Sequence, residues 1–198
     1  MNKMHLTRRG FIQGAAMGIT GAALGSGCAG ARKIETVSGR RKPREDVSPV
    51  SFITGDDRRE MVVQALRPFE KEIREAIRDK QVIVKPNFVF SGNPVCATHP
   101  DAVRGLLDFL KPMYKKQIIL AESTVSPKGT KKLFEEYGFL PLKREYHIEF
   151  VDLNEQPSST FFILGQKLEP SPIQVIDAFL DPKNYLFSIT RPKAHDTV

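Results

Sequence analysis

The sequence predicts an α/β fold: a mostly parallel sheet flanked by helices in three layers, with one or two peripheral antiparallel strands. Short apolar runs such as residues 82–85 and 117–123 are typical of strands that are buried on both faces. Amphipathic helical patterns separate these runs, and this strand–helix–strand spacing indicates a parallel sheet. Residues 159–165 instead alternate in polarity and end at a glycine, which is typical of a peripheral strand that turns back.

The first predicted elements lie before residue 81. Residues 50–54 (VSFIT) are expected to form a strand. Asp56 or Asp57 can cap a helix over residues 58–66, because a side-chain oxygen there accepts hydrogen bonds from the first amides of the helix. Pro68 is expected to kink or restart this helix, since proline lacks the amide donor that a helix interior needs.

The buried strand at 82–85 leads into a further helix. Thr98 meets the requirements of its N-cap, with Pro100 in the first turn and Asp101 three residues after Thr98. The apolar stripe of this helix consists of Val103, Leu106, Leu107 and Leu110.

The same alternation continues to the end of the chain. The strand at 117–123 is followed by a helix over 130–138, and Gly138 is a natural C-terminal stop. Further strands are expected at 148–153, 159–165, 172–179 and 184–190.

Positive charge is concentrated at the N-terminus. The chain has a net charge of +7, from 30 basic and 23 acidic residues. Residues 1–46 hold nine of the basic and three of the acidic residues, which leaves 21 and 20 for the remainder. Because a nucleic-acid surface needs positive charge on the folded domain itself, we expect no nucleic acid among the partners.

Residues 1–31 are typical of an export signal and residues 32–50 of a polar, basic linker, so the folded domain is expected to span 51–198. Arg8 and Arg9 stand in a Thr-Arg-Arg-x-Phe context, before a weakly apolar stretch that is too short to span a membrane. This pattern resembles the twin-arginine motif, which engages the twin-arginine translocase. An ordinary secretory signal is the alternative. The protein is expected to be exported, and to be periplasmic or associated with the cell envelope.

Two alternatives exist for processing of the signal. Cys28 lies in a sequence that resembles a lipoprotein box, although Gly25 stands where that pattern has an aliphatic residue. The other alternative is cleavage after Ala31, at a small-x-small site. We expect the protein at a membrane only if Cys28 is lipidated.

Cysteine content limits the cofactors. Cys96 is the only cysteine beyond the signal region, which excludes an internal disulfide in the mature domain. An iron–sulfur cluster normally needs four cysteine ligands, so the chain holds no such cluster of its own. The sequence assigns no other cofactor.

Polar side chains follow the predicted parallel strands, where ligands bind in sheets of this kind. The candidate ligand-binding residues are Lys85, Asn87, Thr98, His99, Glu122, Ser123, Lys193 and His195. Within this set, the candidate catalytic residues are Lys85, Glu122, Lys193 and His195, and the candidate metal ligands are His99 and His195. Helix N-terminal amides at the same edge would favour a small anionic ligand.

Each candidate also has a structural explanation. Lys85 and Glu122 could form an ion pair that serves only the fold. Asn87 could bond loop backbone, Thr98 could act only as a cap, and Asp152 could be a turn residue. The set is compatible with proton transfer, anion binding or metal binding, and no established catalytic motif selects among them.

Five segments carry a family resemblance: VIVKPNFV, ATHPDAVRGLLDFL, IILAES, FEEYGF and ITRPKAHDTV. In this order they resemble the domain of unknown function 362, over roughly residues 50–198. The resemblance implies an α/β domain of bacteria and archaea, exported by the twin-arginine route in some members. Other members are fused to ferredoxin-like segments, whose cysteines this chain lacks. The resemblance implies no particular reaction.

In that family the Pro-Lys-x-His element is followed by more chain, whereas this sequence stops at Val198. The resemblance therefore implies a domain that is incomplete at its C-terminus, either as a truncated fragment or with the remainder supplied elsewhere. Three hypotheses follow. The protein is an exported enzyme acting on a small anionic or metal-bound substrate, a non-catalytic ligand-binding or accessory protein, or an inactive truncation.

Overall fold

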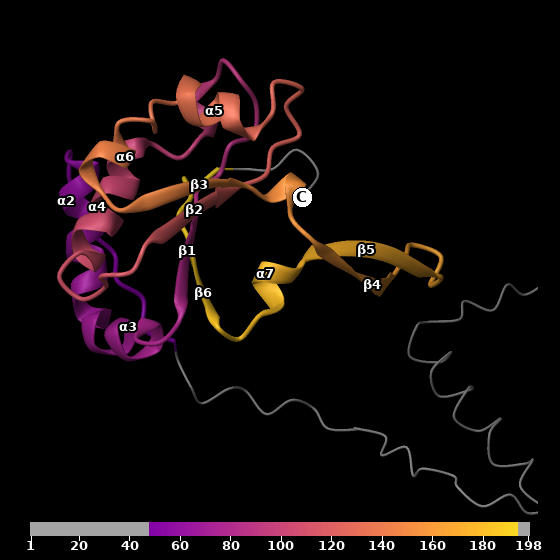
Figure 1. Ribbon diagram of the computed structural model, residues 1–198, viewed down its shortest axis with the longest axis horizontal. Coiled ribbons are helices and arrows are strands. Elements are labelled where there is room, and N and C mark those ends of the chain that lie inside the picture. The colour runs from indigo at the N-terminus through magenta and orange to yellow at the C-terminus, as the bar shows by residue number, and fades with distance from the viewer. Residues whose placement is uncertain (1–47, 194–198) are drawn as a thin grey trace, which may run out of the picture. The chain divides into compact units, whose positions relative to one another are not determined.

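The central sheet contains four parallel strands. The computed structural model describes residues 48–193, and in it the strands are β1 (Gln81–Lys85), β2 (Ile118–Glu122), β3 (Ile148–Asp152) and β6 (Asn184–Ser188). Their order across the sheet is β3-β2-β1-β6 (Figure 1). Lys85 lies beside Ser188, and Glu122 beside Asp152. The predicted α/β fold is confirmed, and the carboxyl ends of the four strands lie along one edge.

Several sequence predictions fall on parts of the chain outside the described residues. These are the arginine pair Arg8 and Arg9, the two processing alternatives at Cys28 and Ala31, nearly all of the linker, and His195.

Helices α2 (Arg58–Leu66), α3 (Glu70–Ile77) and α4 (Pro100–Leu110) lie along one face of the sheet (Figure 1). Asp57 caps α2, as predicted, because its side chain accepts hydrogen bonds from the first amides of the helix. The predicted kink at Pro68 is also confirmed, since a 3-10 turn containing this proline separates α2 from α3.

Close packing of α2 against α4 depends on Gly105. A Cβ atom at this position would lie 2.3 Å from the backbone oxygen of Arg59 and 2.9 Å from Cβ of Val62. Real Cβ atoms do not approach so closely, so the absence of a side chain at Gly105 lets the two helices touch through backbone.

Helices α5 (Thr130–Glu136) and α6 (Leu142–Glu145) connect β2 to β3. Gly138 ends the first of them, as predicted, with a φ of 76°. Only glycine adopts this left-handed backbone without a steric penalty. Short 3-10 segments also occur at Pro94–Cys96 and Leu153–Glu155.

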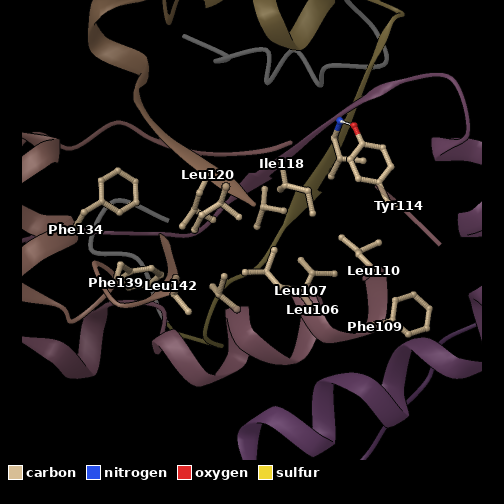
Figure 2. Packing of buried hydrophobic residues seen from close by; sticks show 14 of the residues in the cluster. Leu106, Leu107, Phe109, Leu110, Tyr114, Ile118, Leu120, Phe134, Phe139 and Leu142 are labelled. Carbon is tan, nitrogen blue, oxygen red and sulfur yellow. Dashed lines mark hydrogen bonds between the residues drawn. The ribbon is translucent and has the colours of Figure 1, made fainter. Parts of the chain in front are cut away.

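The larger part of the core lies between the sheet and these helices. Leu107 and Leu110 of α4 pack with Leu120 of β2 and Leu142 of α6, and each is almost fully buried (Figure 2). Tyr114 is also buried, and its hydroxyl accepts a hydrogen bond from the backbone amide of Val82 at 3.0 Å. The amide of Val82, near the start of β1, is therefore bonded to a side chain and not to a neighbouring strand.

The opposite face of the sheet carries a smaller cluster. Ile83, Ala121 and Leu153 are buried there. They pack against Ile176 and against Ala178 of α7 (Asp177–Leu180). Helical cover on both faces gives the three layers that the sequence predicts.

Strands β4 (Ser158–Leu164) and β5 (Pro170–Ile176) form a separate antiparallel hairpin. It extends away from the parallel sheet (Figure 1). The prediction of peripheral antiparallel strands is confirmed. The stretch predicted as a strand over 172–179 ends earlier than expected, because α7 begins at Asp177.

Two local predictions are wrong. Residues 50–54 do not form a strand, since neither edge of either sheet pairs with them, and Phe52 is 84% exposed. Thr98 is not the cap of α4. The cap is His99, whose Nδ1 accepts a hydrogen bond from the amide of Asp101 at 3.2 Å. Thr98 is instead buried and bonded to the ends of two strands.

Candidate functional site

Lys85 and Glu122 form an ion pair at the carboxyl-terminal edge of the sheet. They are the last residues of the adjacent parallel strands β1 and β2. The ammonium of Lys85 donates to Oε2 of Glu122 and also to the backbone oxygen of Pro86, the latter at 3.3 Å. The side chain of Lys85 is 25% exposed, whereas that of Glu122 is 1% exposed. The pair therefore joins a buried acid to a base that reaches the surface.

The loop after β1 encloses the carboxylate of Glu122. Its second oxygen, Oε1, accepts a hydrogen bond from the backbone amide of Phe88 at 3.0 Å. Burial raises the pKa of Glu122 above its usual 4.5, because desolvation penalises the charged form more than Lys85 and the amide of Phe88 favour it. Glu122 is thus an enclosed acid with a raised pKa and one charged neighbour.

Thr98 holds three segments together beside this pair. Its hydroxyl accepts a hydrogen bond from the amide of Asn87 at 2.9 Å and donates to the backbone oxygen of Ile189 at 2.8 Å. Its own amide donates to the backbone oxygen of Asn87 at 3.0 Å. The segments that follow β1 and β6 are therefore bonded to Thr98, the residue before the N-cap of α4.

Asn87 differs from its neighbours because part of its side chain is unsatisfied. Its Oδ1 is buried and has no hydrogen-bond partner among residues 48–193. A buried acceptor without a donor costs free energy, so such atoms in native proteins call for an explanation. A ligand or water that donates to Oδ1 would provide one.

His99 lies at the start of α4 but faces a different pocket. It lines a hollow of about 270 Å³ together with Thr98, Tyr137 and Gly138. Lys85 and Glu122 do not line this hollow. The helix therefore begins at the predicted edge, while His99 lines a hollow that neither residue of the ion pair lines.

The remaining candidates have separate positions. Ser123 follows Glu122 and is half-buried, and Lys193 is exposed in the segment after β6. Asp152 is structural in this arrangement, since its Oδ1 accepts hydrogen bonds from the hydroxyl of Thr130 at 2.8 Å and the amide of Asn154 at 3.0 Å. The structure thus pairs Lys85 with Glu122 and bonds Thr98 to the backbone of Asn87, whereas His99 and Thr98 line a hollow that the ion pair does not line.

A cluster of polar residues after β2 was missed from the sequence. Thr124, Ser126 and Thr130 are buried, although loop hydroxyls usually face solvent. Asn154 donates to the backbone oxygen of Thr124 at 3.1 Å, and the hydroxyl of Thr124 accepts from the amide of Ser126 at 3.1 Å. The signal that could have found them is the hydroxyl-rich stretch STVSPKGT directly after a buried strand.

Neither a cluster of metal ligands nor a membrane-spanning helix occurs within the described residues. Within residues 48–193, no three His, Cys, Asp or Glu side chains are grouped so that they could hold a metal ion. His99 has one carboxylate near it, that of Asp101, with 3.4 Å between Nδ1 and Oδ2. Over the same residues, no helix combines the length and the apolar character that crossing a bilayer requires.

Comparison with known proteins identifies the family. No curated protein and no solved structure matches the chain. One family model, "Domain of unknown function (DUF362)", matches residues 82–197, which are more than half of the chain. The match begins in β1 and includes the ion pair, the Thr98 contacts and the parallel sheet. The chain therefore belongs to the DUF362 family.

Proposed function

We propose that this domain binds a small anionic ligand at the carboxyl-terminal edge of its parallel sheet, with Lys85 as the residue that contacts it. The observation that carries the proposal is the position of the Lys85 ammonium. It is held by an almost fully buried acid, yet a quarter of the lysine side chain remains exposed. A lysine ammonium has three donors. Glu122 and Pro86 take two of them, which leaves one for a ligand.

Two features of the surroundings support an anion. The carboxyl ends of parallel strands are the usual ligand position in such sheets, and α4 begins at the same edge. The amides at the start of a helix carry partial positive charge. The unsatisfied Oδ1 of Asn87 requires a donor, so a ligand with both an anionic group and a hydroxyl or amine fits the site best.

Proton transfer is a second candidate function for the same pair. The observation that favours it is the raised pKa of Glu122, because an enclosed acid whose pKa lies above its usual value can hold and release a proton nearer neutral pH. On this proposal Glu122 exchanges the proton and Lys85 orients the anionic substrate. The non-catalytic alternative uses Lys85 in the same way and Glu122 only as its anchor.

The ligand proposal is tested with inorganic phosphate and malate as probes, by their effect on the thermal unfolding of the protein. A bound ligand stabilises the folded state, so the unfolding temperature of the wild-type protein should rise with probe concentration. The double variant Lys85→Met, Glu122→Gln removes both charges at nearly constant shape and leaves no buried charge unpaired. It should fold and lose the response.

The matched control is Lys131→Ala. Lys131 is an exposed lysine that also pairs with a glutamate, Glu155, so this variant likewise removes one lysine and one ion pair. It should keep the response to both probes. A double variant that still responds would overturn the proposal. If the pair is only structural, no protein responds, and Lys85→Ala alone costs about 3–5 kcal/mol of stability by leaving Glu122 unpaired.

We also propose that the protein is exported by the twin-arginine route, on the basis of Arg8 and Arg9 in their sequence context. Replacing both with lysine should leave the precursor in the cytoplasm, since lysine lacks the planar guanidinium donors. Unchanged export of this variant would exclude the route. If Cys28 is lipidated, Cys28→Ala should release the mature protein from the membrane fraction, whereas a mature N-terminus at Arg32 would show cleavage after Ala31.

A further inference from the structure

The β4–β5 hairpin exposes a strand with no charged residue. All seven residues of β4, Ser158–Leu164, are exposed. Within this strand Phe162 and Leu164 are 68% and 71% exposed. Leu168 at the hairpin tip is 76% exposed and has a φ of 64°, a backbone conformation that is uncommon for leucine. Within residues 48–193 no third strand pairs with either edge of the hairpin, although a two-stranded hairpin is only marginally stable alone.

The hydrogen bonds at the two ends of the hairpin show which backbone groups point outward. Gly165 donates to Glu169, and Asp177 donates to Pro157. Residue pairs in an antiparallel ladder alternate between bonded and non-bonded. The odd-numbered residues of β4 therefore bond to β5. The even-numbered ones, Ser158, Thr160, Phe162 and Leu164, direct their amides and carbonyls to the free edge.

The outer edges of the two strands differ. On β5 the outward amide positions include residues 170 and 172, which are both proline and have no donor. Proline on an edge prevents another strand from pairing there. The outer edge of β4 has no proline and no charge, the usual protections of an edge strand. One edge of the hairpin is closed to pairing and the other is open.

We propose that the open edge of β4 pairs with β4 of a second copy of this chain, forming an antiparallel four-stranded sheet with the two β5 strands outside. An antiparallel pair of identical strands is two-fold symmetric, as most homodimers are. Centred on Phe161, the pairing places Ser158 opposite Leu164 and Thr160 opposite Phe162 of the second copy. Every outward-directed residue of β4 then lies opposite another one, so the whole edge is bonded.

Charge and surface area favour a second copy as the occupant. Because β4 carries no charge, two copies of it do not repel each other. It also offers no charged group that would attract a charged partner. A large apolar side chain has a surface of roughly 150–250 Å², so the partly exposed ones of the hairpin together expose on the order of 500 Å² per copy. That is a substantial part of the ~800 Å² per partner of a standard interface.

The first test compares two proline substitutions in the full chain. Thr160 and Gln174 lie opposite each other, and both point their amides outward, Thr160 from β4 and Gln174 from β5. Thr160→Pro and Gln174→Pro each remove one outward donor and the same side-chain hydrogen bond between the two residues. Light scattering after gel filtration should show a concentration-dependent dimer for the wild type and Gln174→Pro, and a monomer for Thr160→Pro.

The second test uses engineered cysteines in a chain whose Cys28 and Cys96 are replaced by serine. In the proposed register Phe161 faces its own duplicate in a non-bonded pair, with Cα atoms about 4.5 Å apart, which suits a disulfide. Under mild oxidation Phe161→Cys should form a covalent dimer. Ile163→Cys lies on the same strand face but far from its duplicate, and should not.

Three results would overturn the proposal. These are a wild-type chain that is monomeric at all concentrations measured, equal loss of the dimer in both proline variants, or equal crosslinking of both cysteine variants. None of these outcomes bears on anion binding at Lys85, so the two proposals fail independently.

Discussion

Glu122 makes stability depend on pH in a direction opposite to that of most acids. Because burial raises its pKa, the folded protein binds its proton at a higher pH than the unfolded chain does. The free energy of unfolding therefore falls as pH rises from about 4.5 through the folded-state pKa. Glu122→Gln cannot titrate, so urea unfolding at pH 5 and pH 8 should show the wild type losing stability relative to the variant. Parallel pH profiles would contradict this expectation.

Two acids with lowered pKa values, Glu145 and Asp108, affect stability at a lower pH than Glu122 does. The hydrogen bond from Arg104 lowers the pKa of Glu145. For Asp108, burial raises the pKa, but hydrogen bonds from Arg59 and Tyr146 outweigh it and leave the pKa lowered. Their stabilisation is present above their usual pKa values and is lost as pH falls below about 4. These two acids therefore add nothing to the change measured between pH 5 and pH 8, and the comparison with Glu122→Gln isolates the part that depends on Glu122.

Tyr146 provides a test at alkaline pH. Burial, and then its hydrogen bond to Asp108 at 2.8 Å, raise the pKa of Tyr146 to about 12. The folded state keeps the phenol proton where the unfolded chain loses it, so this residue reduces stability as pH rises from about 10 towards 12. We compare the denaturant concentrations at which Tyr146→Phe and the wild type unfold. The advantage of the variant over the wild type should be larger at pH 11 than at pH 9. An unchanged difference between the two proteins would show that the phenol does not titrate in this way.

At the scale of elements, the contact between α2 and α4 is the most sensitive to substitution. Gly105→Ala places a Cβ 2.3 Å from backbone, which cannot move aside without separating the helices. We expect a loss of about 1–3 kcal/mol, the usual cost of overpacking, measured by chemical unfolding. Gly55→Ala is the control, since its Cβ would meet only the flexible side chain of Met61 at 3.3 Å. Equal effects of the two changes would contradict this account.

The strands and their common edge could be predicted because burial on both faces leaves an unmistakable apolar run. Residues 82–85 and 117–123 have such runs, and both were placed to within one or two residues. Residues 50–54 have a similar composition but no pairing partner. Sequence patterns describe one strand at a time, whereas a strand forms only where a neighbour supplies hydrogen bonds.

The candidate site was predicted in part for the same reason. Lys85 and Glu122 end adjacent strands, so topology alone places them together. His99 and Thr98 are neighbours that can both accept a hydrogen bond from an amide, and composition does not decide which of them caps α4. The separate hollow that His99 lines, and the burial of Thr124 and Thr130, depend on tertiary packing and could not be predicted from residue spacing.

For the whole molecule, amide hydrogen exchange should rank the elements by burial. Exchange from the most protected sites requires global unfolding, whereas exposed segments open locally. The amides of Val82, Val84 and Leu120 lie in central strands with almost no exposure and should exchange slowest. Those of β4 should exchange fastest in dilute solution. Slow exchange from β4 in a dilute monomer would contradict the ranking.

The order of strands in the sheet also determines when it can be completed during synthesis. Gln81 pairs with Asn184, so β1 must wait for about a hundred further residues before its second neighbour exists. At roughly 5–20 residues per second, this delay lasts several seconds or more. During that time β1, which contains Val82, Ile83 and Val84, can pair with β2 on one edge, and its other edge is unpaired. The nascent chain therefore exposes an apolar strand with one unpaired edge, and protection of that edge by a chaperone would have to last until β6 emerges.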